Sequence, residues 1–125
     1  MKLEIHEALQ IKRILMPFSE QKLPIKTSYK MVKLISNIEK EGVIFDEQLQ
    51  KLLAEYAVKN EEGKIDFVDG GIAIEKGKED EFYKEFDELN SIEIEIADIK
   101  FTVEELSNLE ISPKDLYQLD KIIEE

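Results

Sequence analysis

The chain has 125 residues, of which 42% are hydrophobic and 37% charged, and its formal net charge is −12. This apolar content excludes a disordered chain, and the length suits one domain, residues 1–125, with a single core. The net negative charge argues against direct binding to nucleic acid. The absence of cysteine excludes disulfides and thiolate metal sites.

Charge is distributed unevenly along the chain. Residues 1–40 carry a net charge of +4, and residues 41–125 carry a net charge of −16. The N-terminus has no apolar run of the kind found in signal peptides, and no segment approaches the ~20 apolar residues of a membrane span. We therefore expect a cytoplasmic protein that does not associate with membranes.

The first part of the chain predicts a short strand and then two helices. Residues 2–5 alternate polar and apolar side chains, which favours a strand. From Glu7 the apolar residues recur every three or four positions, and Pro17 is expected to end this first helix. A second helix is predicted over roughly 27–59, with Thr27 or Ser28 as its cap.

The second helix carries a heptad-like pattern, in which apolar positions alternate at spacings of four and three: Met31, Ile35, Ile38, Gly42, Phe45, Leu49, Leu52 and Tyr56. The pattern keeps its phase across Gly42, which favours one long helix over two helices broken at Glu41-Gly42. The first half would pack on the preceding helix. The far half needs another partner, so Phe45, Leu49, Leu52 and Tyr56 form a predicted self-association seam.

The second part of the chain predicts mixed structure. Residues 64–68 and 72–75, joined by Asp69-Gly70-Gly71, are typical of a β-hairpin. A helix over 79–90 and an amphipathic strand over 92–96 follow. Thr102 to Glu105 matches a capping box, and Ser112-Pro113 opens the last helix. The buried face of that last helix is predicted to contain Leu116, Leu119, Ile122 and Ile123.

The predicted fold class is therefore α+β. Residues 1–60 form mainly a helical hairpin with one long heptad-patterned helix. Residues 61–125 supply a β-hairpin, a helix, a strand and a C-terminal helix. The hairpin and the amphipathic strand are expected to form one small antiparallel sheet.

The order of these features resembles an uncharacterised family of small proteins encoded by phages and prophages of Gram-positive bacteria. The segments that carry the resemblance are Leu23–Lys30, Leu52–Ala57, Lys59–Gly63, the turn Asp69–Gly71, Phe82–Leu89, Ile92–Ile96, Ile111–Pro113 and Leu119–Glu125. The resemblance extends from Leu23 to Glu125, about four fifths of the chain. The resemblance implies a phage setting, and hence the cytoplasm of a bacterial host. It implies no activity and no active-site residues.

Motifs for catalysis are missing from the sequence. His6 is the one histidine, and it stands beside Glu4 and Glu7, where a locally paired histidine is the simplest interpretation. No serine lies in a G-x-S-x-G elbow, and the five glycines form no phosphate-binding loop. We predict that the chain is not an enzyme and has no catalytic, cofactor or metal site.

A basic ridge is predicted near the start of the long helix, where Lys26, Lys30 and Lys33 share one side. Three interpretations remain open: a solvated face, a surface that follows a phosphate backbone, or a surface that attracts the acidic part of a second copy. The absence of arginine from the ridge weakens the nucleic-acid interpretation.

An acidic face is predicted over the helix 79–90 and the strand that follows it. Its members are Glu79, Asp80, Glu81, Glu85, Asp87, Glu88, Glu93 and Glu95. Such a face can occupy a basic groove of a host or anti-phage defence protein and exclude DNA from it. We therefore predict a non-enzymatic accessory protein that binds a protein partner. The alternative is a phage assembly or virion-associated factor that self-associates into a homo-oligomer.

Overall fold

The computed structural model describes residues 1–68 and 71–124. The chain divides into two compact units, which we describe one at a time. Unit 1 contains Met1–Gly42 and Glu93–Glu125, and unit 2 contains Val43–Ile92. The two ends of the chain thus share a unit, which the division at residue 60 did not anticipate. That the whole chain acts as one domain stays a prediction.

Helix α2 (Ile25–Tyr56) contributes its first part to unit 1 and its second part to unit 2. The other elements of unit 1 are β1 (Lys2–Glu4), α1 (Ile5–Leu15), the 3₁₀ helix η1 (Met16–Glu20), β4 (Glu93–Glu95), β5 (Phe101–Thr102), α4 (Val103–Leu106), α5 (Pro113–Gln118), the 3₁₀ helix η2 (Asp120–Ile122) and β6 (Ile123–Glu124). The other elements of unit 2 are β2 (Phe67–Val68), β3 (Gly71–Ile72) and α3 (Glu79–Asn90).

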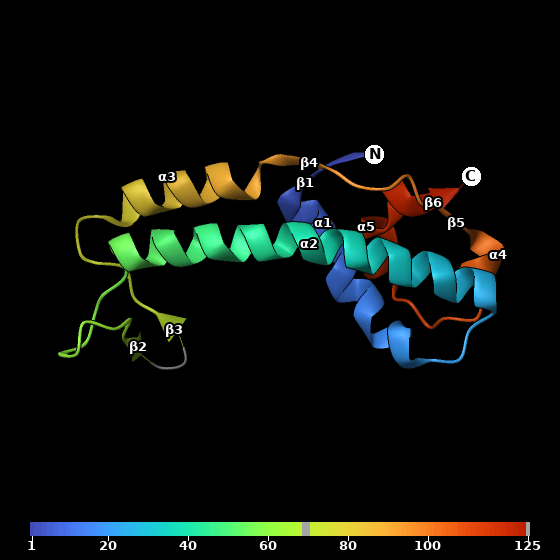
Figure 1. Cartoon of the computed structure of the whole chain (residues 1–125), viewed down its shortest axis with the longest axis horizontal. Coiled ribbons are helices and arrows are strands. Elements are labelled where there is room, and N and C mark those ends of the chain that lie inside the picture. Colours follow the sequence, from blue (N-terminus) through green and yellow to red (C-terminus); the bar gives the residue numbers. More distant parts are fainter. Residues whose placement is uncertain (69–70, 125) are drawn as a thin grey trace. The chain divides into compact units, whose positions relative to one another are not determined.

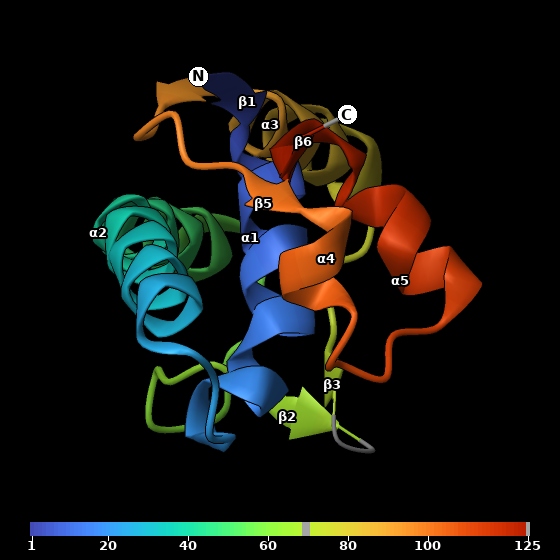
Figure 2. The ribbon, with the colours of Figure 1, turned by 90° about the vertical axis from the view of Figure 1, so that its right-hand side faces the viewer.

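The core of unit 1 lies around α1, which Figure 2 shows between α2 and α5. Apolar residues of α1 recur at helical spacing and are fully covered, as are their partners from α2 and from the C-terminal segment. The buried side chains include Ala8, Ile11, Leu15, Met31, Leu34, Ile38, Phe101, Leu119 and Ile122. This packing confirms the predicted helical hairpin, and it is the main stabilising term of the unit.

Helix α2 is continuous through Gly42, as predicted. A methyl group at Gly42 would lie 3.4 Å from Cδ2 of Leu9, so α1 passes close to the helix there. The predicted cap was wrong: the helix begins at Ile25, directly after Pro24, whose carbonyl accepts from the Ser28 N–H at 2.9 Å. Thr27 is buried instead, and its hydroxyl donates to Glu105 at 3.4 Å.

Two predicted caps in the C-terminal segment are confirmed. The Thr102 hydroxyl accepts from the Glu105 N–H, and the Ser112 hydroxyl accepts from the Asp115 N–H at 3.1 Å. The buried face of the last helix was only partly right. Leu119 and Ile122 are fully buried, whereas Leu116 is exposed. Helix α5 ends at Gln118, before the predicted face is complete.

Unit 2 is built on the second part of α2, with α3 running beside it (Figure 1). Between the two helices the chain forms the predicted hairpin, in which Phe67 pairs with Ile72 and an isolated bridge joins Ala57 to Ile74. The predicted turn residues Asp69 and Gly70 lie outside the described residues. Gly63 has a φ of +78°, the left-handed conformation that glycine adopts most readily.

The α+β fold class is confirmed, but the strand pairing differs from the prediction. Strand β4 pairs antiparallel with β1, with Leu3 opposite Ile94, and it does not join the hairpin. Strands β5 and β6 form a short parallel pair that the sequence did not predict. In this position Ile94 of β4 is half-buried against the core of unit 1, and Ile96, just after the strand, is buried in that core. Within residues 1–68 and 71–124, no helix combines the length and the apolar character needed to cross a membrane.

Candidate functional site

Helix α3 presents the strongest concentration of charge in the described structure. Its twelve residues include six acids and one lysine. Three of the acids, Glu79, Asp80 and Glu81, occupy the first turn, where the partial positive charge of the helix N-terminus favours them. The Glu79 carboxylate also accepts from the Gly77 N–H at 2.9 Å. The acidic residues at the start of α3 therefore stabilise the helix.

The apolar side of α3 fixes the helix on unit 2. Phe82 is buried, and its ring lies 6.1 Å from that of Tyr56 in an edge-to-face arrangement and 5.6 Å from that of Phe86. Leu52, Leu53 and Ala57 complete the cluster. Because this side is anchored, the acidic side is held toward solvent.

All six acids of α3 are exposed, and none forms an ion pair within the part of the chain that the structure describes. In unit 2 the described ion pair is the one between Lys78 and Glu75. Unit 2 carries six lysines and fourteen acidic residues, a net charge of −8, whereas unit 1 carries −4. Most of the net charge thus belongs to the smaller unit.

A shallow hollow marks one side of α3. It is lined by Tyr56, Glu81, Lys84, Glu85 and Glu88. Burial and a hydrogen bond to Glu85 raise the pKa of the Tyr56 hydroxyl to about 12, and the nearby carboxylates add to this shift. The glutamates occur at spacings of four and three, so they share one side of the helix. This side can receive a cationic group from a partner.

Two members of the predicted acidic face lie in the other unit. Glu93 and Glu95 belong to β4 in unit 1. The Glu95 carboxylate pairs with the amino group of Met1 at 3.1 Å, and Glu93 stands opposite Glu4 in the β1–β4 ladder. The eight predicted residues therefore fall into an α3 group of six and a β4 pair.

The predicted basic ridge is incomplete. Lys26 and Lys33 are exposed, but the Lys30 amino group donates to Glu105 at 2.8 Å and to the Lys100 carbonyl at 3.0 Å. This amino group also lies 5.8 Å from the centre of the Phe101 ring. The Lys30 contact and a hydrogen bond from the Thr102 N–H lower the pKa of Glu105 to about 2. Lys30 thus serves the interior contacts of unit 1.

The predicted self-association seam is only partly accessible. Leu52 and Tyr56 are buried against α3, and Phe45 and Leu49 are half-buried. A heptad pattern predicts that a helix face will be covered, but it does not identify the covering helix. In this chain α3 covers the last two positions of the seam.

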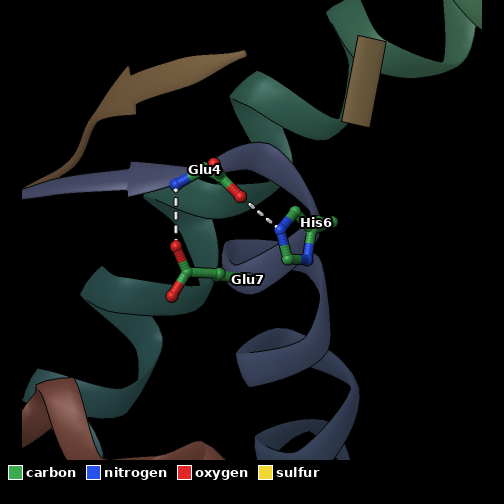
Figure 3. Close-up of side chains that lie close together, drawn as sticks. All are labelled: Glu4, His6 and Glu7. Atoms are coloured by element: carbon green, nitrogen blue, oxygen red, sulfur yellow. Dashed lines mark hydrogen bonds and ion pairs between the residues drawn. The ribbon is translucent and has the colours of Figure 1, made fainter. Parts of the chain in front are cut away.

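Glu4, His6 and Glu7 form the one group of possible metal-ligating side chains within the described residues, with ligand atoms within 4.8 Å of one another (Figure 3). Each acid already has a local role. Glu7 accepts from the Glu4 N–H at 3.2 Å and pairs with Lys121 at 2.7 Å, while Glu4 contacts the His6 ring. The Lys121 hydrogen bond holds the pKa of Glu7 below its ordinary value. These contacts stabilise the start of α1 and its junction with the C-terminal segment.

One exposed surface was missed in the sequence. Ile25, Tyr29 and Val32 of α2 are exposed by 85%, 69% and 60%. Their spacing of four and three places them on one side of the helix, opposite the buried Met31 and Leu34. The sequence does contain a signal for this surface, because apolar residues occur on both sides of the helix. The heptad pattern includes the residues of one side only.

Comparison with known proteins gives no relative: no protein-family model, curated protein or solved structure matches the chain.

Proposed function

We propose that the chain is a non-catalytic protein-binding module, which docks the acidic surface of α3 onto a basic surface of a partner protein. The observation that carries this proposal is the contrast in charge pairing between the units. Six of the seven described ion pairs lie in unit 1, whereas the six acids of α3 have none. Free carboxylates on an anchored helix provide steering and complementarity without loss of internal contacts.

In the phage setting that the resemblance implies, the partner is a host protein or an anti-phage defence protein. Carboxylates at spacings of three and four along a helix present negative charge to a groove that otherwise binds phosphates. A basic, nucleic-acid-binding protein fits this description. Occupation of its groove excludes DNA, which gives the acidity of unit 2 a mechanism of inhibition.

The test is affinity capture from host lysate, followed by measurement with the purified partner. We expect the triple variant Glu81→Gln, Glu85→Gln, Glu88→Gln to lose capture, because it removes the charge on one side of α3 and leaves Phe82 in place. Duplex DNA should compete with the wild-type chain for the partner, and added salt should weaken the complex.

A matched control neutralises the same number of exposed acids in unit 1. The triple variant Glu20→Gln, Asp98→Asn, Glu110→Gln changes the net charge equally and should retain the partner. Equal loss in both triple variants would mean that only total charge matters. Retention of the partner by the α3 variant would rule out the acidic surface as the docking site.

The second candidate function is that of an assembly or virion-associated factor that self-associates. The exposed stripe of Ile25, Tyr29 and Val32 favours it, because an apolar stripe of this kind on a helix is a common mark of an interaction surface. Affinity capture from lysate of phage-infected host cells distinguishes the candidates: a basic partner that duplex DNA displaces supports the inhibitor, and capture of a phage structural subunit supports assembly.

A further inference from the structure

The exposed side of α2 in unit 1 combines apolar and basic residues. Tyr29 lies at its centre, with Ile25 and Val32 on one flank. Lys26 and Lys33 lie on the other flank, three residues before and four residues after Tyr29. Both lysines are exposed, and neither forms an ion pair with the described residues. A protein of net charge −12 therefore displays a small cationic surface around an exposed aromatic ring.

Helix α3 carries the same arrangement with the opposite charge. Tyr83 is 57% exposed, and Asp80 and Asp87 lie three residues before and four residues after it. In both helices the charged pair is seven residues apart, about 10.5 Å along the axis. Lysine–tyrosine–lysine on α2 thus matches aspartate–tyrosine–aspartate on α3 in spacing. Reversal of one helix shifts the tyrosines by a single residue, about 1.5 Å, so either direction of approach keeps both charge pairs.

We propose that the α2 surface of one copy binds the α3 surface of a second copy. Two lysine–aspartate contacts then flank a contact between Tyr29 and Tyr83, and Ile25 and Val32 lose water beside it. The occupant is argued from charge complementarity and matched spacing. The contact joins two different surfaces, so a pair of copies keeps one free α2 surface on one copy and one free α3 surface on the other. Association is therefore head to tail and continues into chains or closes into a ring.

This inference does not rest on the proposed function. Asp80, Tyr83 and Asp87 share one side of α3, whereas Glu81, Glu85 and Glu88 share another. Substitutions on the two sides can be made separately. Failure of self-association therefore leaves the binding of a basic partner untouched, and the reverse also holds.

The experiment is sedimentation velocity of the full chain over a wide range of concentration at low and moderate salt. Wild-type protein should form a salt-sensitive, concentration-dependent oligomer. The double variants Lys26→Glu, Lys33→Glu and Asp80→Lys, Asp87→Lys should each weaken it at least about tenfold. A mixture of the two should associate again, because the aspartate variant keeps the wild-type α2 surface and the lysine variant keeps the wild-type α3 surface.

The control is the double variant Lys64→Glu, Lys114→Glu, which reverses two exposed lysines elsewhere and should associate as the wild type does. Far-UV circular dichroism establishes that each variant is folded. A wild-type chain that is monomeric at every concentration overturns the proposal, as does a mixture that fails to associate. Binding of single-stranded DNA that depends on Lys26 and Lys33, without self-association, would assign the α2 surface to nucleic acid and also overturn it.

Discussion

A substitution at Gly42 tests whether α2 is continuous, through its effect on the free energy of unfolding. Glycine inside a helix costs about 1 kcal/mol relative to alanine, because the unfolded chain loses more freedom when it folds. The added methyl group would meet Cδ2 of Leu9 at 3.4 Å, which is ordinary van der Waals contact with the flexible end of a side chain. We therefore expect Gly42→Ala to raise the free energy of unfolding by about 0.5–1 kcal/mol. For a chain of this size that corresponds to about 2–5 °C in Tm.

The matched control is Gly63→Ala. No atom lies within 4 Å of the added methyl group, so packing does not oppose the substitution. The φ of +78° does oppose it, since alanine in the left-handed region costs about 1–2 kcal/mol. The same chemical change should therefore stabilise at residue 42 and destabilise at residue 63. Urea denaturation followed by far-UV circular dichroism measures both.

The test is whether Gly42→Ala raises and Gly63→Ala lowers the free energy of unfolding. If Gly42→Ala lowers the free energy of unfolding, there are two explanations. Either α2 is interrupted at this residue, or the Leu9 side chain of α1 lies closer to the added methyl group than 3.4 Å and clashes with it. A leucine-to-alanine change at Leu9 separates these cases. It relieves crowding and restores stability to the Gly42→Ala chain in the second case, but it has no such effect in the first.

Four further predictions concern the contacts within each unit. Glu105→Gln should lower the free energy of unfolding by about 1 kcal/mol at neutral pH. It should also abolish the loss of stability that the wild type shows as pH falls from about 5 to 2, because the folded chain holds the pKa of Glu105 at about 2. Acid titration followed by circular dichroism measures both effects. Phe82→Ala should cost about 3 kcal/mol in unit 2, and hydrogen exchange should quicken in α3 but not in α1; equal quickening would contradict separate cores. Tyr56→Phe should remove the tyrosine absorbance step near pH 12. The wild type should lose stability above about pH 10, because the Tyr56 hydroxyl ionises there in the unfolded chain but not yet in the folded chain. Ser112→Ala should cost about 1 kcal/mol in urea denaturation, through loss of the cap on α5.

The sequence predicted those features that depend on neighbouring residues. Helix α3, the caps at Thr102 and Ser112, and the passage of α2 through Gly42 all follow from local spacing and capping chemistry. Each is decided by residues within about two helical turns. Such patterns are visible in one sequence because the physical interaction has the same range as the pattern.

The errors arose where a residue has a distant partner. Lys30 meets Glu105 across 75 residues, and β4 meets β1 across about 90. Nothing near Lys30 separates a lysine that pairs with Glu105 from the exposed lysines Lys26 and Lys33. The same holds for Leu52 and Tyr56, since a covered heptad position looks identical for an internal partner and for a second copy.

The distribution of charge also depends on pairing between residues that are distant in the sequence. In the linear sequence the first forty residues are basic and the remainder is acidic, which suggests a molecule with two oppositely charged parts. Folding brings the basic segment together with the acidic C-terminal segment in unit 1, where Lys30–Glu105, Lys121–Glu7 and Arg13–Asp115 pair across them. Because the basic segment belongs to unit 1, that unit has a net charge of −4, and unit 2 has a net charge of −8. The net negative charge that remains for a partner is therefore concentrated in unit 2, which contains α3. Among the exposed lysines of α2, Lys26 and Lys33 flank Tyr29 at the spacing with which Asp80 and Asp87 flank Tyr83.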